Sequence, residues 1–352
     1  MCYTNHFLII YNFMNIDTVD VCCGLGWGDE AKGKITSSLA SSNNYDFICR
    51  WSGGDNAGHT IYIDNNKYET HLIPCGVFYN IKSIIGPDCV VNIDGFFKEI
   101  NYIKEKGFND KLIKISPYAH IVTDKHIEQD ISLLSNKQGT TKRGIAPCYS
   151  DKYRRIGKQV KDIEVLKPYI WDENLYGNIL CEGAQGFWLD INHGNYPYVT
   201  SSYTLPYSAC SLGFPPQKIN DIYGAVKIYD TRVGADPDFE NISIDEEILE
   251  QIGKVGKEFG VTTGRKRKVM WLNVDKLIKA INISGCTKII ISKIDILEEV
   301  GVFKFIFNTK LNEYDNLHDL KSELCVILMN SCNFLKQIIF SDSPKSISSL
   351  II

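Results

Sequence analysis

The first candidate for chemistry in this sequence is a glycine- and lysine-rich segment, residues 24–34, directly behind the apolar run 19–23. An apolar strand that leads through such a turn into a helix binds nucleotide phosphates, because backbone N–H groups and the helix N-terminus attract anions. From Gly28 the spacing is that of a phosphate loop, with Gly33 and Lys34 after four intervening residues. The segment therefore predicts a nucleotide-phosphate site.

Two positions in and beside this loop differ from those of a nucleotide hydrolase. Ile35 stands where such an enzyme has the Ser or Thr that holds magnesium, and Asp29 lies within the loop itself. A carboxylate next to phosphates is repelled by them unless it binds the metal or moves a proton. The arrangement favours a reaction in which the phosphate is handed on by something other than a simple GTPase.

A second glycine-rich loop, residues 50–60, carries a candidate acid. His59 is flanked by Asn56 and Thr60, and the loop follows an apolar strand. An isolated histidine more often has a structural role, but its place in a polar, glycine-rich loop favours catalysis. A histidine beside a phosphoanhydride donates a hydrogen bond to the charge that develops during transfer.

Three further segments combine small residues with cations, hydroxyls or amides: residues 138–155, 181–202 and 259–268. Paired threonines and arginines in the first suit a phosphate monoester, although a solvated basic loop is the commoner outcome. In the second, the Gln185 amide can read a base edge, whereas Asp190 and His193 lack a third metal ligand and are expected to be structural. In the third, four consecutive cations after Thr-Thr-Gly indicate a loop that grips carboxylates and phosphates.

A short segment near the end of the chain bears on the choice of nucleotide. Lys293 and Asp295 follow the apolar strand 287–291, and an aspartate there accepts both guanine N1–H and the 2-amino group. Adenine offers neither donor at those positions, so the motif favours GTP over ATP.

The bulk composition places these motifs in a globular protein. With 44% hydrophobic and 23% charged residues and a net charge of −4, the sequence predicts neither a nucleic-acid-binding nor a membrane protein. Twelve scattered cysteines without a Cys-x-x-Cys pair predict reduced thiols and a cytoplasmic location. Residues 1–15 are too short and lack the charge pattern for an anchor or signal peptide, so we expect a flexible extension, with Met14 as an alternative start.

The elements that must position these motifs alternate between apolar strands and helical patterns. Helical periodicity covers 96–106, 126–134, 244–259 and 274–284, between fully apolar runs typical of strands buried on both faces. We therefore predict an α/β fold with a mostly parallel central sheet flanked by helices. The polar segments follow the apolar runs, at the carboxyl ends of strands where such sheets bind ligands. We expect one domain over residues 16–352, with elaborate active-site loops.

Six of the motifs, in this order, resemble those of the adenylosuccinate synthetase family: GWGDEAKGK (26–34), NAGHT (56–60), GTTKRGI (139–145), EGAQG (182–186), YPYVTSS (196–202) and TTGR (262–265). The resemblance implies a P-loop-NTPase-like ligase of AMP biosynthesis. GTP phosphorylates the 6-oxygen of IMP, and L-aspartate displaces that phosphate to give adenylosuccinate, GDP and phosphate. Relative to the family, the chain is shorter in its middle and C-terminal parts.

The resemblance also assigns site residues. Asp29 matches the general base that takes the IMP N1 proton, His59 the general acid, and Gln185 a further catalytic residue. Asp29 and the Gly58 carbonyl match ligands of one Mg²⁺ per site. Arg155 matches an arginine that reaches the IMP of a neighbouring subunit, which implies a homodimer.

The substrate-binding positions fall into three sets. For IMP the matching residues are Asp29, Glu30, Ala31, Lys32, Asn56, Ala57, Gly58, His59, Thr141, Arg155, Gln185, Thr200 and Arg265. For aspartate they are Val261, Thr262, Thr263, Gly264, Arg265, Lys266 and Arg267. For GTP they are Gly28, Asp29, Glu30, Ala31, Lys32, Gly33, Lys34, Gly58, His59, Thr60, Arg267, Lys293, Ile294, Asp295 and Ser341.

Some positions depart from the family pattern. Ala31 and Lys142 replace glycines, and the C-terminal guanine-contacting segment is reduced to residues 341–344. Two alternatives stay open at this point: a guanine nucleotide-binding protein without ligase activity, and a catalytically impaired synthetase homologue.

Overall fold

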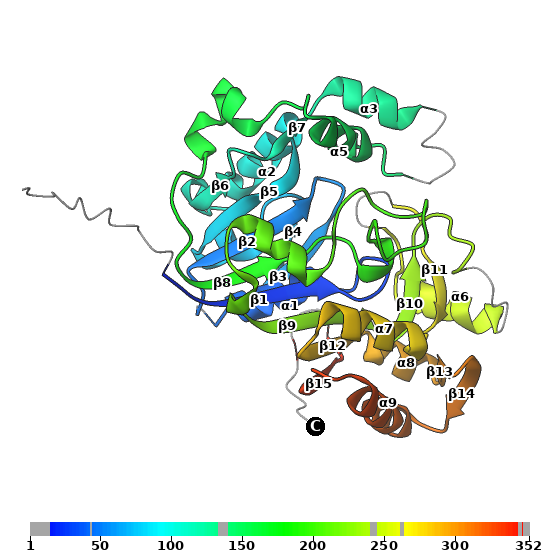
Figure 1. The fold of residues 1–352 in the computed structure, drawn as a ribbon. Helices are drawn as coiled ribbons and strands as arrows, with labels where there is room; N and C mark the ends of the chain where they lie inside the picture. The colour runs from blue at the N-terminus through cyan, green and yellow to red at the C-terminus, as the bar shows by residue number, and fades with distance from the viewer. Residues whose placement is uncertain are drawn as a thin grey trace, which may run out of the picture.

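A nine-stranded sheet forms the centre of the computed structural model, which describes residues 15–42, 44–132, 140–239, 245–260, 264–343 and 347 (Figure 1). The strands are β1 (Ile16–Gly24), β2 (Phe47–Gly53), β3 (His59–Ile63), β4 (Asn66–Thr70), β5 (Lys82–Asn92), β6 (Ile113–Ile115), β7 (His120–Val122), β8 (Gly177–Glu182), β9 (Ile219–Lys227), β10 (Tyr229–Arg232), β11 (Lys268–Trp271), β12 (Lys288–Ser292), β13 (Phe303–Phe307), β14 (Lys310–Tyr314) and β15 (Gln337–Ser341). The α-helices are α1 (Lys32–Ala40), α2 (Ile93–Glu105), α3 (Asp124–Ile131), α5 (Ile145–Arg154), α6 (Glu246–Val255), α7 (Val274–Ser284), α8 (Ile294–Val300) and α9 (Leu317–Ser331). Met14 and the rest of the expected extension before Asn15 lie outside the described residues.

The order of strands in the large sheet is β15-β12-β9-β1-β8-β2-β5-β6, with β7 also paired to β5. Each of these pairings is parallel. The predicted α/β fold with a mostly parallel sheet is therefore confirmed. Three two-stranded antiparallel pairs, β3-β4, β10-β11 and β13-β14, lie outside it and were not predicted.

The central strands are buried on both faces, as their unbroken apolar runs predict. Along β2, Phe47 and Cys49 belong to one hydrophobic cluster and Ile48 to the other. The same alternation continues in β8, where Ile179 and Leu180 join opposite clusters. Since successive side chains of a strand point to opposite faces, helices and loops must cover both sides of the sheet.

Helix ends follow local capping rules where the polar residues allow it. The Asn92 side chain accepts a hydrogen bond from Gly95 N (2.7 Å) at the start of α2, and Asn273 accepts one from Lys276 N (2.9 Å) at the start of α7. α6 corrects one expectation: it ends at Val255 rather than at Phe259, because Gly256 closes the helix and Lys257 adopts φ 50°. The expected helix 126–134 ends at Ile131, and residues 133–134 lie outside the described residues.

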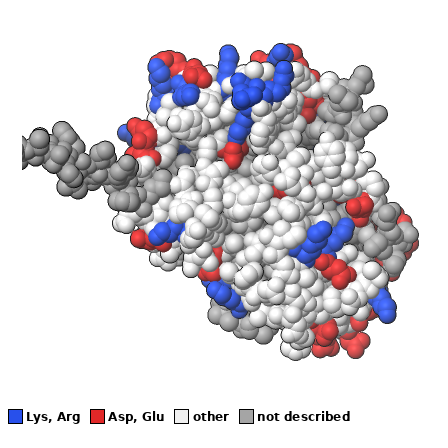
Figure 2. All heavy atoms as spheres, viewed as in Figure 1, with Lys and Arg blue, Asp and Glu red and all other residues white. Residues whose placement is uncertain are grey.

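Two groups of helices lie near opposite ends of the sheet. α7, α8 and α9 accompany β12 and β15 at one end, and α3 and α5 lie together near β7 at the other (Figure 1). On the face seen in Figure 2, acidic and basic side chains form neighbouring clusters around a largely uncharged centre. Among the described residues no helix has the length and apolar character needed to cross a bilayer.

Five of the candidate site segments lie at the ends of strands in the run β15-β12-β9-β1-β8-β2, one at each of these strands except β9. The phosphate loop follows β1, residues 54–58 follow β2, and Gln185 lies just beyond β8. Lys293 follows β12, and Ser341 is the last residue of β15. Because all these strands are parallel, their carboxyl ends meet at one edge and bring the segments together.

Candidate active site

The phosphate loop contains an unusual run of left-handed backbone. Gly28 has φ 91°, Asp29 has φ 60° and Ala31 has φ 66°, and α1 begins at Lys32. Glycine adopts such angles freely, but alanine has no side-chain group that compensates for the strain. The sequence comparison that singled out Ala31 as a glycine replacement therefore identified a position that does need positive φ.

Glu30 holds the loop from within. Its Oε1 accepts hydrogen bonds from Gly26 N (3.1 Å) and Gly28 N (2.8 Å), and its Oε2 lies 2.5 Å from Lys32 Nζ. The side chain is buried. The Glu30 carboxylate is thus engaged in shaping the loop.

The loop after β2 packs directly against the phosphate loop. A Cβ added to Gly33 would lie 3.1 Å from His59 Cβ and 3.2 Å from Thr60 O, so only glycine fits there without displacement. At the start of this loop the Asn56 side chain accepts a hydrogen bond from Gly54 N (3.2 Å). The structure therefore brings Gly58, His59 and Thr60 beside the residues expected to bind phosphates.

The His59 ring lies in a buried group of charges. Its Nδ1 contacts Glu182 Oε1, and Arg50 donates to its Nε2 at 2.8 Å. Burial lowers the pKa of His59 and Arg50 lowers it further, while Glu182 opposes both. Burial alone would raise the pKa of Glu182, but His59, Arg50 and the Cys75 N–H outweigh it and hold that pKa at about 2. Both ring nitrogens are therefore engaged, so the His59 ring must break one of these contacts before it can hydrogen-bond to a substrate.

Gln185 offers an unused acceptor to a ligand. It has φ 55° just beyond β8, and its Oε1 is buried without a hydrogen-bond partner among the described residues. A Cβ added to Gly53 would lie 3.3 Å from that oxygen. A buried amide oxygen normally has a partner, so this one fits a donor supplied by a ligand.

The loop that carries Thr200 is fixed by Asp190. Asp190 Oδ1 accepts from Asn192 N (2.9 Å), and Oδ2 accepts from Thr204 N (2.6 Å). The carboxylate is fully buried, so Asp190 has the structural role that the sequence predicted. Within this loop, the Thr200 hydroxyl lies 3.5 Å from Ser202 Oγ.

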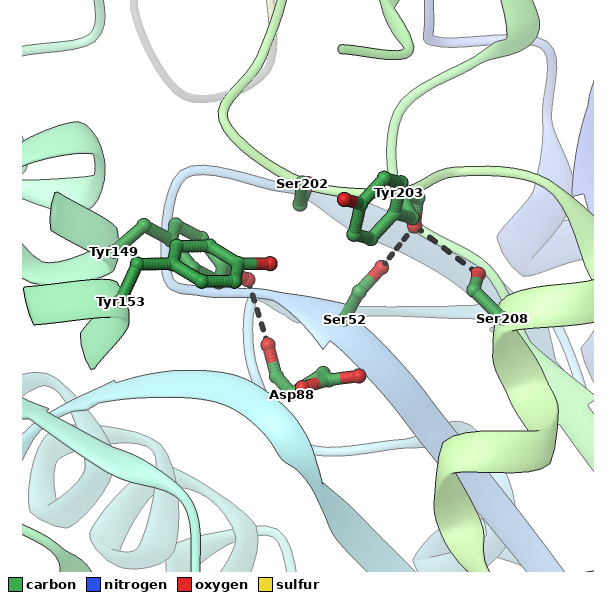
Figure 3. Close-up of a pocket in the computed structure, with 7 residues that line it drawn as sticks. All are labelled: Ser52, Asp88, Tyr149, Tyr153, Ser202, Tyr203 and Ser208. Atoms are coloured by element: carbon green, nitrogen blue, oxygen red, sulfur yellow. Dashed lines mark hydrogen bonds between the residues drawn. The ribbon is translucent and has the colours of Figure 1, made fainter. Parts of the chain in front are cut away.

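A small pocket separates this loop from α5 (Figure 3). Ser52 Oγ donates to Tyr203 O at 2.9 Å on one side of it, and Tyr149 OH donates to Asp88 O at 2.6 Å on the other. Its lining residues are Ser52, Asp88, Tyr149, Tyr153, Ser202, Tyr203 and Ser208. The pocket thus adjoins both the Thr200 loop and the helix that ends beside Arg155.

The segment before α5 is tied to the second loop. Arg143 NH1 lies 3.1 Å from Asp55 Oδ2, which joins the segment that contains Thr141 to the loop that contains Asn56. Lys142, the second glycine replacement, has φ 58°. Arg155 caps the far end of α5 with φ 64° and an exposed side chain.

The predicted aspartate loop reaches the phosphate loop through one arginine. Arg267 NH2 lies 2.7 Å from Asp29 Oδ2, and Arg267 NH1 contacts the buried Glu258. Gly264, Arg265 and Lys266 are exposed, and Val261, Thr262 and Thr263 lie outside the described residues. The candidate base is therefore paired with a cation from a distant motif.

The expected guanosine end of the site forms around Lys34. Its Nζ donates to Ser341 Oγ (2.7 Å) and Ser343 O (3.0 Å). Burial lowers the pKa of Lys34 to about 8 against the opposing charge of Asp295. Burial raises the pKa of Asp295 while Lys293 lowers it, and Ile294 begins α8 between them. Three motifs far apart in sequence thus share one cluster.

Four buried charged residues next to the site received no role from the sequence: Arg50, Glu182, Lys227 and Glu258. Each pairs with a predicted site residue or with another member of this set. A usable signal existed for Arg50 and Lys227, because each stands in or at the end of an apolar strand where an unpaired charge is costly. Among the described residues no cluster of three His, Cys, Asp or Glu side chains forms a metal site.

The fold and these loops define an α/β enzyme that uses a nucleoside triphosphate. The family model described as adenylosuccinate synthetase matches residues 21–176 and 167–323. Adenylosuccinate synthetase of Thermodesulfovibrio yellowstonii is 36% identical over 87% of this chain and 84% of its own. That of Trichoplax adhaerens is 34% identical over 94% of this chain and 89% of its own.

Solved structures agree with the sequence relatives. The fully ligated adenylosuccinate synthetase of Plasmodium falciparum superposes with a TM-score of 0.78 and 26% identity, covering 95% of this chain and all of that one. Succinoaminodeoxyadenylate synthetase of cyanophage S-2L, at 18% identity and a TM-score of 0.70, shares the fold. The chain belongs to the adenylosuccinate synthetase family. It is a GTP-dependent ligase of AMP biosynthesis, as the motifs predicted.

Proposed function

We propose that this site joins IMP to L-aspartate, with Asp29 as general base and His59 as general acid. The observation that carries the proposal is the contact between Asp29 and Arg267 at 2.7 Å, which links the phosphate loop to the loop expected to bind aspartate. A base is needed where the γ-phosphoryl group arrives, because removal of the IMP N1 proton makes the 6-oxygen nucleophilic. Asp29 lies in the loop that receives the phosphates, so proton removal and phosphoryl transfer occur at one place.

The second step explains the position of the cation. Once the 6-oxygen carries phosphate, it is a leaving group that the aspartate amine can displace. Arg267 lies beside Asp29, and together with Arg265 it supplies positive charge for the aspartate carboxylates. His59 would donate a hydrogen bond to the departing GDP, and Gln185 would use its free Oε1 toward the purine.

One Mg²⁺ fits this arrangement. Asp29 offers a half-buried carboxylate and Gly58 a backbone carbonyl, and both are hard oxygen donors of the kind that Mg²⁺ prefers alongside substrate phosphates. When bound, the ion would neutralise charge on the transferred phosphoryl group. Such a site needs few protein ligands, because water and phosphate oxygens complete the coordination.

The predicted substrate residues divide along the carboxyl edge of the sheet. GTP would lie over the phosphate loop with its base at Lys293, Asp295 and Ser341. IMP would lie between Gln185, Asn56, Thr141 and Thr200. Aspartate would bind beside Arg267, with Val261, Thr262, Thr263, Gly264, Arg265 and Lys266 as its further expected contacts. We also propose that residues 16–352 form one domain and that the enzyme acts in the cytoplasm.

A homodimer would complete the IMP site. Arg155 is exposed at the end of α5, and its neighbours Tyr153 and Ile156 are 61% and 59% exposed. A cation surrounded by exposed apolar side chains suits a subunit interface better than bulk solvent. Arg155 would then contact the IMP phosphate of the partner.

The experiment that tests the function is an assay of GDP and adenylosuccinate formation with IMP, aspartate and GTP, with and without Mg²⁺. Asp29→Asn should lower kcat by about 10²–10⁴-fold, the contribution typical of a general base, while the Kd for IMP stays within a few-fold. Asp172→Asn, an exposed loop substitution, is the matched control. Near-normal turnover in Asp29→Asn would remove Asp29 as the base. Nucleotide binding without any turnover in the wild type would identify the impaired homologue, and GTP hydrolysis without IMP would identify a GTPase.

A further inference from the structure

Glu258 is a buried carboxylate, outside the predicted site residues, that contacts several cationic side chains. It follows α6 and is 1% exposed. Its carboxylate accepts from Lys227 Nζ (2.8 Å) and from Tyr229 OH (2.8 Å), and it contacts Arg267 NH1. Lys293 Nζ lies 3.7 Å away. Two of these partners, Arg267 and Lys293, are residues that the proposed function assigns to substrates.

The backbone of Glu258 also holds Arg267. Arg267 N donates to Glu258 O at 3.0 Å, and an isolated bridge pairs Phe259 with Lys266 just above it. Glu258 and Arg267 therefore face each other. Arg267, the last of the expected aspartate residues, is joined to Glu258 through both main chain and side chain.

The charges explain why one carboxylate can hold three cations. Burial would raise the pKa of Glu258, but Lys227, Arg267 and Lys293 outweigh it and hold that pKa at about 2. With Asp29 included, the group has three cations and two carboxylates. The excess positive charge lies where phosphates and aspartate carboxylates are expected.

We propose that Glu258 is a positioning residue for the ligation reaction: it fixes the Arg267 guanidinium so that one side of it meets Glu258 and the other meets Asp29. The inference rests on the proposed function, since it presumes that Arg267 and Asp29 face the substrates. Arg267 has several rotatable bonds, and a guanidinium held on one side presents its remaining N–H groups in a fixed direction. Glu258 touches no reacting atom itself and acts through Arg267.

The competing explanation is that Glu258 only balances the buried charge of Lys227. Burial lowers the pKa of Lys227 and Glu258 raises it, so removal of Glu258 alone leaves an uncompensated cation. Glu258→Gln is therefore expected to unfold at a lower temperature whichever explanation holds. The double variant Lys227→Met/Glu258→Gln removes both members of the pair and separates the two explanations.

The test compares wild type, Glu258→Gln, Glu258→Asp and Lys227→Met/Glu258→Gln by thermal unfolding and by steady-state kinetics. Positioning predicts that the double variant regains stability over Glu258→Gln, yet its kcat/KM for aspartate stays at least 100-fold below wild type, with a smaller change in KM for IMP. Glu258→Asp, which keeps the carboxylate, should recover at least tenfold over Glu258→Gln. A double variant with kcat/KM for aspartate within threefold of wild type would overturn the positioning role. A wild type without ligase activity would instead overturn the proposed function, so the two failures are distinguishable.

Discussion

Ala31 is a point of strain in the phosphate loop that a single substitution can relieve. It has φ 66° and ψ 31° and stands at the N-cap of α1 without a side-chain hydrogen bond. The left-handed conformation costs a non-glycine residue roughly 1–2 kcal/mol, because Cβ approaches the following carbonyl oxygen. We therefore expect Ala31→Gly to stabilise the protein.

The net gain is smaller than the strain itself. Glycine has more freedom in the unfolded chain, which returns roughly 0.5–1 kcal/mol. Glycine is also a better N-cap than alanine, which adds a few tenths in favour of the variant. The balance is a stabilisation of about 1 kcal/mol, which corresponds to a rise in Tm of about 1–3 °C for a chain of this size.

Thermal unfolding at neutral pH without nucleotide measures this difference. Ala146→Gly is the matched control, because Ala146 is exposed in the first turn of α5, where the greater freedom of glycine in the unfolded chain costs up to about 1 kcal/mol. The two variants make the same chemical change and should shift Tm in opposite directions. If Ala31→Gly lowers Tm as Ala146→Gly does, the strain at Ala31 is not a destabilising factor.

Three further predictions concern charged residues: Lys34 and Asp295 at the site, and Asp230, a buried carboxylate of β10 that lines a pocket together with Gly28 and Glu30. Lys34 has a pKa of about 8 and loses its charge as the pH rises, so KM for GTP should increase about tenfold between pH 7 and 9. Lys34→Arg should show no such rise, because arginine stays charged over this range. A KM for GTP that does not change with pH in the wild type would contradict this prediction. Burial raises the pKa of Asp230 from 3.8 to about 7. Below pH 3.8 the carboxyl group is protonated in both the folded and the unfolded state, so it does not lower the free energy of unfolding. As the pH rises to 7, that free energy falls by up to about 4 kcal/mol, because the unfolded state loses the proton first. Asp230→Asn should then exceed wild-type Tm at pH 8 but not at pH 4, and equal differences at both would refute the linkage. Asp295→Asn should lower kcat/KM for GTP about 10–100-fold and narrow its advantage over ATP, and an unchanged GTP/ATP ratio would remove Asp295 from the guanine site.

Elements of the fold could be predicted from the sequence where the hydrophobic runs are unambiguous. The predicted strand 287–291 and helix 274–284 match β12 (Lys288–Ser292) and α7 (Val274–Ser284) closely. The hairpin β13-β14 was missed because its short strands are partly exposed and alternate only weakly. The end of α6 was misplaced because apolar periodicity continues past Gly256 while the backbone does not.

The sequence predicted only those features of the site that lie within single motifs. Glycine spacing marks a phosphate loop, and the loop does lie at the carboxyl end of β1. The partners of the buried charges could not be predicted, because Arg50 meets Glu182 and Lys227 meets Glu258 only after the strands assemble. A charge within an apolar run indicates that a partner exists, but the sheet order decides which residue it is.

The two glycine replacements show where local preference gives way to the assembled site. Ala31 at φ 66° and Lys142 at φ 58° keep backbone angles that their side chains disfavour. Contacts hold the chain beside both turns, because Glu30 accepts from Gly26 N and Gly28 N in the first and Arg143 pairs with Asp55 next to the second. Backbone strain thus occurs at two separate motifs and is imposed by the surrounding contacts. Such strain is expected where the backbone itself must contact a ligand. The geometry of this site is therefore maintained by neighbouring contacts rather than by the conformational preference of each residue.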